Sequence, residues 1–142
     1  MTRSGPKRQP ESDEWAWLSR TLIETLHAET VSRFGGTPGT RDDAILESAL
    51  ARPRHLAHYG EPSVFELASA YGAGIISHHP FVDGNKRTGL LAARVFLFKH
   101  GYRLSPQEAE TVAVIRQVAA GDLGPDALTE WLEANSTPIS TT

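Results

Sequence analysis

Residues 78–89 read "HHPFVDGNKRTG", and they set two cations at the point where an apolar helix is predicted to begin. The macrodipole of a helix favours negative charge at its N-terminus by about 0.3–1 kcal/mol, so Lys86 and Arg87 are unfavourable there unless an anion binds. Free backbone N–H groups, a glycine turn and two cations together form a phosphate cradle. Gly84 lets the backbone approach such a ligand closely.

Three further residues of this stretch fit the same chemistry. Asp83 is out of place beside phosphate unless a divalent cation lies between them, and Mg²⁺ typically takes one or two carboxylates plus phosphate oxygens. His79 precedes Pro80, which predicts an extended backbone before the helix, and a neutral imidazole there accepts a proton from an attacking hydroxyl. Phe81 is predicted to point inward. Each residue alone is typical of an ordinary turn, but their joint spacing indicates phosphoryl or nucleotidyl transfer.

The whole chain sets wider limits. It has 142 residues, which suits one domain with a single core. It contains no cysteine, so a disulfide framework and a thiolate zinc site are excluded. The net charge of −3 gives no global basic field for direct nucleic-acid binding. No apolar run approaches the roughly 20 residues of a membrane span, and the N-terminus lacks the apolar core of a signal peptide. We expect a cytoplasmic protein that contacts no membrane.

Helical patterns extend from the motif toward the N-terminus. Residues 1–11 are polar and predict a flexible tail. Ser12 is expected to cap a helix that carries leucines on one face and ends at Gly35. Thr40 is expected to cap a second helix, which Pro53 closes. The following "HLAHYGEP" is interpreted as a loop, with a short hairpin as the alternative.

Helical patterns also fill the second half of the chain. Ser63 and Glu66 form a capping box for a helix through Ile76. The motif helix is predicted over residues 85–100. Ser105 is expected to cap the next helix, which Gly121 stops, and "PDALTEWLEAN" forms the last one. No stretch alternates long enough to demand a strand. The sequence therefore predicts an all-α domain of about six helices over residues 12–135, with residues 136–142 as a C-terminal tail.

The motif also carries a resemblance. "HPFVDGNKRTG" is similar to the Fic/Doc (Fido) motif, His-x-Phe-x-(Asp/Glu)-Gly-Asn-x-Arg-x-x-Arg. Six residues match it at fixed spacing: His79, Phe81, Asp83, Gly84, Asn85 and Arg87. "RFGGTPGTRDDAILESALARP", "FELASAYGAGI", "RVFLFKHGYRL" and "AAGDLGPDALTEWL" resemble the death-on-curing (Doc) branch of the superfamily. The resemblance implies a compact all-α Fido core.

The resemblance implies roles for individual residues. His79 would be the general base, with Asp83, Lys86 and Arg87 completing the catalytic group. Asp83 would bind Mg²⁺, and the phosphates of ATP would be held by Gly84, Asn85, Lys86 and Arg87. Members of this branch are toxins of toxin–antitoxin pairs, and the best-known activity is phosphorylation of elongation factor Tu, which inhibits translation. The implied partners are a protein substrate with a hydroxyl group and an antitoxin segment that folds on binding.

Two departures bear on which group is transferred. Leu90 stands where the Fic motif ends in Arg, and with Lys86 this is the Doc pattern, which favours phosphoryl transfer. Gly84 instead matches the Fic form, since Doc itself has Ala there. Arg94 lies seven residues after Arg87 on the same helical face, so it either reaches toward the gap at Leu90 or forms an ion pair. The alternatives are therefore AMP transfer (AMPylation) and a non-catalytic Fido module that binds a nucleotide or partner.

Residues outside the motif suggest little more. His55 and His58 flank the segment interpreted as a loop, where they either dock a target as part of a binding flap or are ordinary polar loop residues. His27 is expected to be an ordinary helix-face residue. The self-inhibitory helix of some Fic proteins is not matched, because Thr129 and Glu133 are followed by Ala134. Restraint of a toxin is therefore expected to come from a partner.

Overall fold

The computed structural model describes residues 14–139. The expected flexible tail at residues 1–11 and the Ser12 cap lie outside this range. Within it there are six helices: α1 (Arg20–Phe34), α2 (Asp43–Tyr59), α3 (Val64–His78), α4 (Asn85–Lys99), α5 (Glu108–Ala120) and α6 (Pro125–Ala134). Two three-residue strands complete the elements: β1 (Tyr102–Leu104) and β2 (Ser136–Pro138). The predicted all-α class is confirmed. None of the described helices is both long and apolar enough to cross a bilayer.

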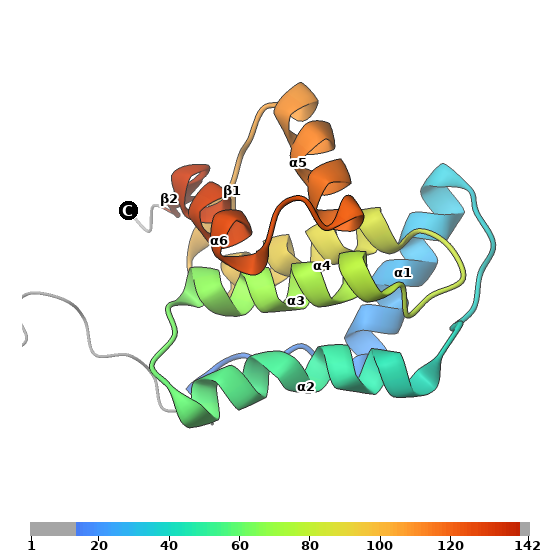
Figure 1. Ribbon diagram of the computed structural model, residues 1–142, viewed down its shortest axis with the longest axis horizontal. Coiled ribbons are helices and arrows are strands. Elements are labelled where there is room, and N and C mark those ends of the chain that lie inside the picture. The colour runs from blue at the N-terminus through green and yellow to red at the C-terminus, as the bar shows by residue number, and fades with distance from the viewer. Residues whose placement is uncertain (1–13, 140–142) are drawn as a thin grey trace, which may run out of the picture.

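The α3 helix lies at the centre and packs against α2, α4, α5 and α6 (Figure 1). Most of its side chains are buried, as expected of a helix surrounded by others. It approaches α4 closely where Gly72 faces Gly89. A Cβ at Gly89 would lie 2.5 Å from Ile76 Cγ1 and 2.9 Å from the Gly72 carbonyl oxygen. Because α3 and α4 pack this closely, both ends of the loop that joins them are fixed in position.

The first helix begins later than predicted. Ser19 is its N-cap and accepts a hydrogen bond from Leu22 N–H. Before it, Trp15 and Leu18 enter the core on an irregular segment. The backbone here bonds to side chains and not within a helix. For example, Leu18 N–H donates to Tyr71 Oη over 3.0 Å. Burial of two large apolar residues in tertiary contacts therefore outweighs the helical pattern there.

The second helix is longer than predicted. Its N-cap is Asp42 and not Thr40, because the Asp42 carboxylate accepts from Ile45 N–H over 3.0 Å. Pro53 lies inside the helix, where it removes one backbone hydrogen bond, and it is buried. The helix continues to Tyr59, so the predicted loop is wrong for residues 55–59 and right for residues 60–62, and the alternative hairpin is wrong. His55 and His58 are exposed on a helix and flank no flap.

The C-terminal half confirms most local predictions and adds a sheet. The capping box of Ser63 and Glu66 is present, and Gly121 ends α5. The α5 helix is capped at Gln107, since Ser105 N–H donates instead to the Asn135 carbonyl oxygen over 2.8 Å. There β1 and β2 pair antiparallel. No alternating pattern had predicted these short strands, and residues 136–138, which were expected to lie in the C-terminal tail, belong to the fold.

His100 joins the irregular N-terminal segment to the end of α4. Its Nδ1 donates to the Phe96 carbonyl oxygen over 2.8 Å, so its Nε2 is the acceptor for Ala16 N–H at 3.1 Å. Trp15 and Phe96 enclose the ring. Burial lowers the pKa of His100, although the hydrogen bond to Phe96 opposes this, and nearby Lys99 lowers the pKa further. The folded state therefore holds the neutral imidazole.

This arrangement predicts a loss of stability in acid. Because the folded pKa of His100 lies below the unfolded value of about 6.5, its contribution is complete above that pH and is lost as the pH falls through the folded pKa. Urea unfolding from about pH 7.5 to about pH 5 should show a smaller decline in the free energy of unfolding for His100→Gln than for the parent. The other histidines are the same in both proteins, so identical declines would contradict the prediction.

Candidate active site

The loop between α3 and α4, residues 79–84, is called the motif loop. It begins at His79, the C-cap of α3, which has left-handed dihedral angles of φ 52° and ψ 59°. The expected extended conformation is wrong, because His79 N–H still bonds to the Ile75 carbonyl oxygen and the chain reverses immediately afterwards. His79 is the one non-glycine residue with positive φ among residues 14–139. Such a residue costs about 1–3 kcal/mol and persists only where its surroundings fix it.

Arg41 is the residue that fixes His79. Its Nε donates to the His79 carbonyl oxygen over 2.6 Å and its Nη2 to the His78 carbonyl oxygen over 2.9 Å. Its backbone N–H donates to the Pro80 carbonyl oxygen over 2.7 Å. The His79 side chain is exposed and has no hydrogen-bond partner in the described part of the chain. One imidazole nitrogen is therefore available to take a proton.

The Asn85 side chain, at the start of α4, forms two hydrogen bonds with the backbone of the motif loop. Its Oδ1 accepts from Phe81 N–H and its Nδ2 donates to the Phe81 carbonyl oxygen, each over 3.0 Å. Asn85 is buried, and Phe81 points into the core as predicted. Both side-chain groups of Asn85 thus bond to the protein itself. Only the backbone N–H of Asn85 therefore remains for its implied role in holding phosphate.

The Asp83 carboxylate lies at the surface between two backbone donors. Its Oδ1 accepts from Gly84 N–H over 2.9 Å, and its Oδ2 accepts from Thr37 N–H over 3.2 Å. An ionised carboxylate offers about four lone-pair directions, so acceptor capacity remains. No group of three or more His, Asp or Glu side chains in residues 14–139 is placed to hold a metal ion. Mg²⁺ bound by one carboxylate and the phosphates of a nucleotide fits this donor set.

The predicted change from loop to helix at "DGNKR" is confirmed. Gly84 is the N-cap of α4 with φ 76°, and it makes no side-chain cap. The first N–H groups of α4 therefore lack intrahelical acceptors. Lys86 and Arg87 follow in the first turn, both exposed, and neither forms an ion pair with any residue from 14 to 139. The Arg87 guanidinium lies 4.1 Å over the Phe34 ring.

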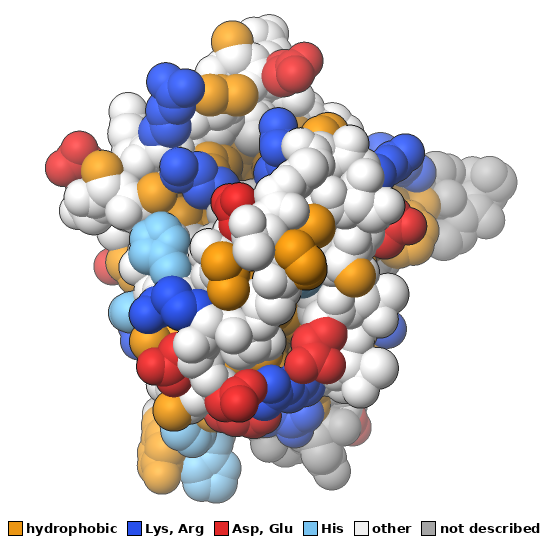
Figure 2. Space-filling model, turned by 90° about the vertical axis from the view of Figure 1, so that its right-hand side faces the viewer, with side chains coloured by type: hydrophobic (Ala, Val, Ile, Leu, Met, Phe, Trp, Pro, Cys, Tyr) orange, Lys and Arg blue, Asp and Glu red, His pale blue; other side chains and the backbone are white. Residues whose placement is uncertain are grey.

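This end of the molecule presents the two loops α1–α2 and α3–α4 together. Figure 2 views it directly, with Lys, Arg and His side chains around the loop surface and carboxylates among them. A hollow of about 390 Å³ lies between α1 and α4. Arg87, Leu90 and Arg94 share its α4 wall, and Arg33 and Glu29 lie on the α1 side. The alternative of an ion pair at Arg94 is wrong for the described residues, since Arg94 makes none there.

Comparison with known proteins agrees with this geometry. The model of the Fic/DOC family matches residues 17–97, which covers more than half of the chain. This chain belongs to the Fic/DOC family. It is similar to the "Protein kinase doc" of Escherichia phage P1, with 33% identity over 96 residues, 66% of this chain and 76% of that protein. It is also similar to the "Toxin Doc" of Mycolicibacterium smegmatis, with 36% identity over 74 residues, 51% of this chain and 57% of that protein.

The Fic/DOC motif loop depends on residues that the sequence interpretation missed. Arg41 was assigned no role, and His27 was expected to be an ordinary helix-face residue. Thr37 supplies a backbone donor to Asp83. These residues lie 38 to 56 positions from their partners along the chain. The available signal was "GGTPGTR", a glycine-rich segment that ends in a cation, since its turns require close contact with something.

Proposed function

We propose that this chain is a Doc-like toxin that transfers a phosphoryl group from a nucleoside triphosphate to a protein hydroxyl in the cytoplasm. The observation that carries the proposal is the exposed, unbonded His79 imidazole beside an uncapped α4 N-terminus with two unpaired cations. The names of the two relatives, a protein kinase and a toxin, support the same function. Elongation factor Tu is the proposed target, translation the process inhibited, and an antitoxin the restraining partner.

The proposed step follows from the positions of these groups. His79 accepts the proton of the target hydroxyl, whose oxygen forms a bond to the γ-phosphorus of ATP. The bond from that phosphorus to the bridging oxygen breaks, and ADP leaves. Lys86, Arg87 and the free N–H groups of α4 would hold the phosphates and offset their charge. Mg²⁺ held through Asp83 would supply further charge neutralisation to the phosphates.

AMP transfer is the second candidate, because one observation favours it. Leu90 provides no charge, yet Arg94 lines the same hollow as Arg87 from two helical turns along α4. A cation there adds positive charge beside the position that the Fic motif fills with Arg. A non-catalytic binding module is less well supported, since both His79 and Asp83 are present and accessible.

The position of the transferred label distinguishes these functions. The protein is incubated with Mg²⁺, a bacterial extract or purified elongation factor Tu, and ATP labelled at either the α- or the γ-phosphate. We expect label to enter a protein band from the γ-position alone. Label from the α-position alone would contradict the kinase and favour AMP transfer. No label from either position would favour the binding module.

Two variants refine this experiment. Leu90→Arg places a cation at the end of the Fic motif, and Arg94→Gln removes the one farther along α4. If Arg94 supports the phosphate chain, Arg94→Gln should weaken ATP binding by more than the exposed control Arg52→Gln on α2. If Leu90 determines which phosphorus is attacked, Leu90→Arg should increase label from the α-position.

A further inference from the structure

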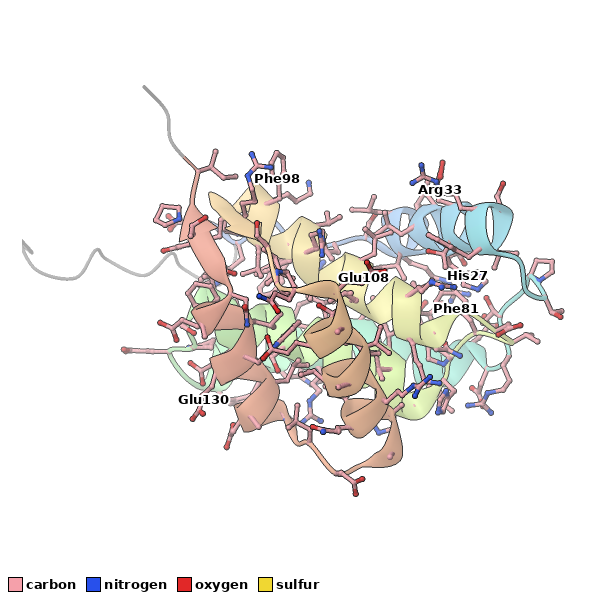
Figure 3. The ribbon with its side chains drawn as sticks, turned by 90° about the horizontal axis from the view of Figure 1, so that it is seen from above. His27, Arg33, Phe81, Phe98, Glu108 and Glu130 are labelled. Atoms are coloured by element: carbon pink, nitrogen blue, oxygen red, sulfur yellow. The ribbon has the colours of Figure 1, made fainter. Side chains whose placement is uncertain are left out.

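His27 is a buried, titratable side chain beneath the motif loop that the proposed chemistry does not use. It lies on the inner face of α1 and is 5% exposed. Its ring stacks on Phe81, with centroids 3.9 Å apart and planes inclined by 8°. Figure 3 shows the two side chains beside each other where α1 meets the loop.

A hydrogen bond joins His27 to the residue proposed to hold the metal. The His27 Nε2 atom lies 2.8 Å from the Asp83 carbonyl oxygen. A carbonyl oxygen can only accept, so His27 must carry a hydrogen on Nε2. The alternative tautomer would set two lone pairs against each other at this distance. The structure therefore requires the form of His27 protonated at Nε2.

The ring also supports the turn that begins α4. A Cβ at Gly84 would lie 3.7 Å from His27 Cδ2 and 3.8 Å from its Nε2. The imidazole thus faces the side of Gly84 where a side chain would project, and it bonds to the carbonyl group that precedes Gly84. On the other side of this peptide unit, Gly84 N–H donates to the Asp83 carboxylate. The His27 side chain and the Asp83 carboxylate thus bond to the two ends of the same peptide group.

We propose that His27 is a positioning residue, which fixes the Asp83–Gly84 peptide so that the Asp83 carboxylate and the first N–H groups of α4 face the same ligand. This role rests on the proposed function, in which Asp83 and α4 act on Mg²⁺ and phosphate. The stacked Phe81 ring fixes the plane of the imidazole, and the hydrogen bond from Nε2 fixes the direction of the Asp83 carbonyl group. His27 itself contacts neither the metal nor the nucleotide.

Two replacements separate the ring from the hydrogen bond. His27→Phe keeps a ring against Phe81 and removes the donor, whereas His27→Gln keeps an N–H at about the position of Nε2. His58→Phe on the exposed face of α2 is the matched control. Hydrogen exchange is measured without nucleotide at the amides of Thr37 and Gly84, which donate to the Asp83 carboxylate.

We expect exchange at these two amides to be about tenfold faster in His27→Phe and close to the parent rate in His27→Gln and His58→Phe. Amides in the middle of α3, such as that of Ile75, should not change. Parent rates at Thr37 and Gly84 in His27→Phe would overturn the proposal. Equal acceleration at Ile75 would also overturn it, because the role would then be general stability.

The parent protein provides a test that requires no variant. The ¹⁵N resonances of the His27 ring should identify the tautomer protonated at Nε2, with slow exchange of that proton. A ring protonated only at Nδ1 would overturn the proposal. In the transfer assay, His27→Phe should raise the Mg²⁺ concentration for half-maximal rate about tenfold, with a smaller effect on the maximal rate. If the parent transfers no label, the proposed function fails while the exchange and tautomer results still decide the role of His27.

Discussion

Replacing His79 with alanine is expected to reduce transfer by about 10²–10⁴-fold and to leave the fold intact. The imidazole is exposed and makes no hydrogen bond within residues 14–139, so its removal breaks no described contact. The free energy of unfolding should change by less than about 0.5 kcal/mol. Label transfer from ATP measures the loss of activity, and urea unfolding measures the stability. Growth arrest on expression gives an independent measure of toxicity.

His78 offers a matched control one residue away. It is also exposed, but its Nδ1 lies 3.2 Å from the Gly74 carbonyl oxygen, to which it can donate. His78→Ala should therefore retain transfer. His79→Gly should be as inactive as His79→Ala yet more stable than it, because glycine adopts φ 52° without the steric cost of a Cβ. Full transfer by His79→Ala would exclude a general base at this position.

Replacing Asn85 with alanine should have the largest effect on stability, a loss of about 2–6 kcal/mol. The reason is that Asn85 satisfies both the N–H and the carbonyl group of Phe81, which is 1% exposed. Truncation leaves two backbone groups without partners, and each costs about 1–3 kcal/mol when water does not replace the bond. The measurement is the free energy of unfolding in urea, without any nucleotide.

The neighbouring residue Lys86 provides the contrast. It is exposed and unpaired, so Lys86→Ala should change stability by less than about 0.5 kcal/mol while it weakens ATP binding. If Asn85→Ala were as stable as Lys86→Ala and lost ATP affinity instead, the Asn85 side chain would bind phosphate, as the family resemblance implied. The two variants therefore separate the anchoring role of Asn85 from its implied ligand role.

Local signals in the sequence predicted those elements whose causes are local. Ser63 and Glu66 bond to each other across one turn, so their capping box is visible in four letters. Ser105 resembles an equally good cap, but its N–H pairs with Asn135, thirty residues away. Pro53 lies inside a helix, where burial against the rest of the protein offsets the lost hydrogen bond. In both cases a tertiary contact outweighed the local preference, and no short pattern reveals such a contact.

The candidate site shows the same difference between local and distant causes. His79, Asp83, Lys86 and Arg87 could be grouped from the sequence because the motif is contiguous, and they lie in one loop and the first turn of α4. The conformation of His79 was mistaken, because the rule for residues before proline carries no information about Arg41, whose side chain binds the preceding carbonyl groups. His27 was missed for a related reason, since its partner lies on a different element.

The loop between α1 and α2 touches the motif loop largely through its own main chain. Val82 N–H bonds to the Gly39 carbonyl oxygen, and Thr40 forms a β-bridge with Phe81. Main-chain bonds do not depend on which side chain is present. Thr37, Pro38 and Thr40 can therefore be replaced by other residues without loss of these bonds. A library randomised at these three positions should retain many correctly folded members. Substitutions at these three positions would therefore change the surface beside the motif loop while the main-chain bonds that hold the loop remain.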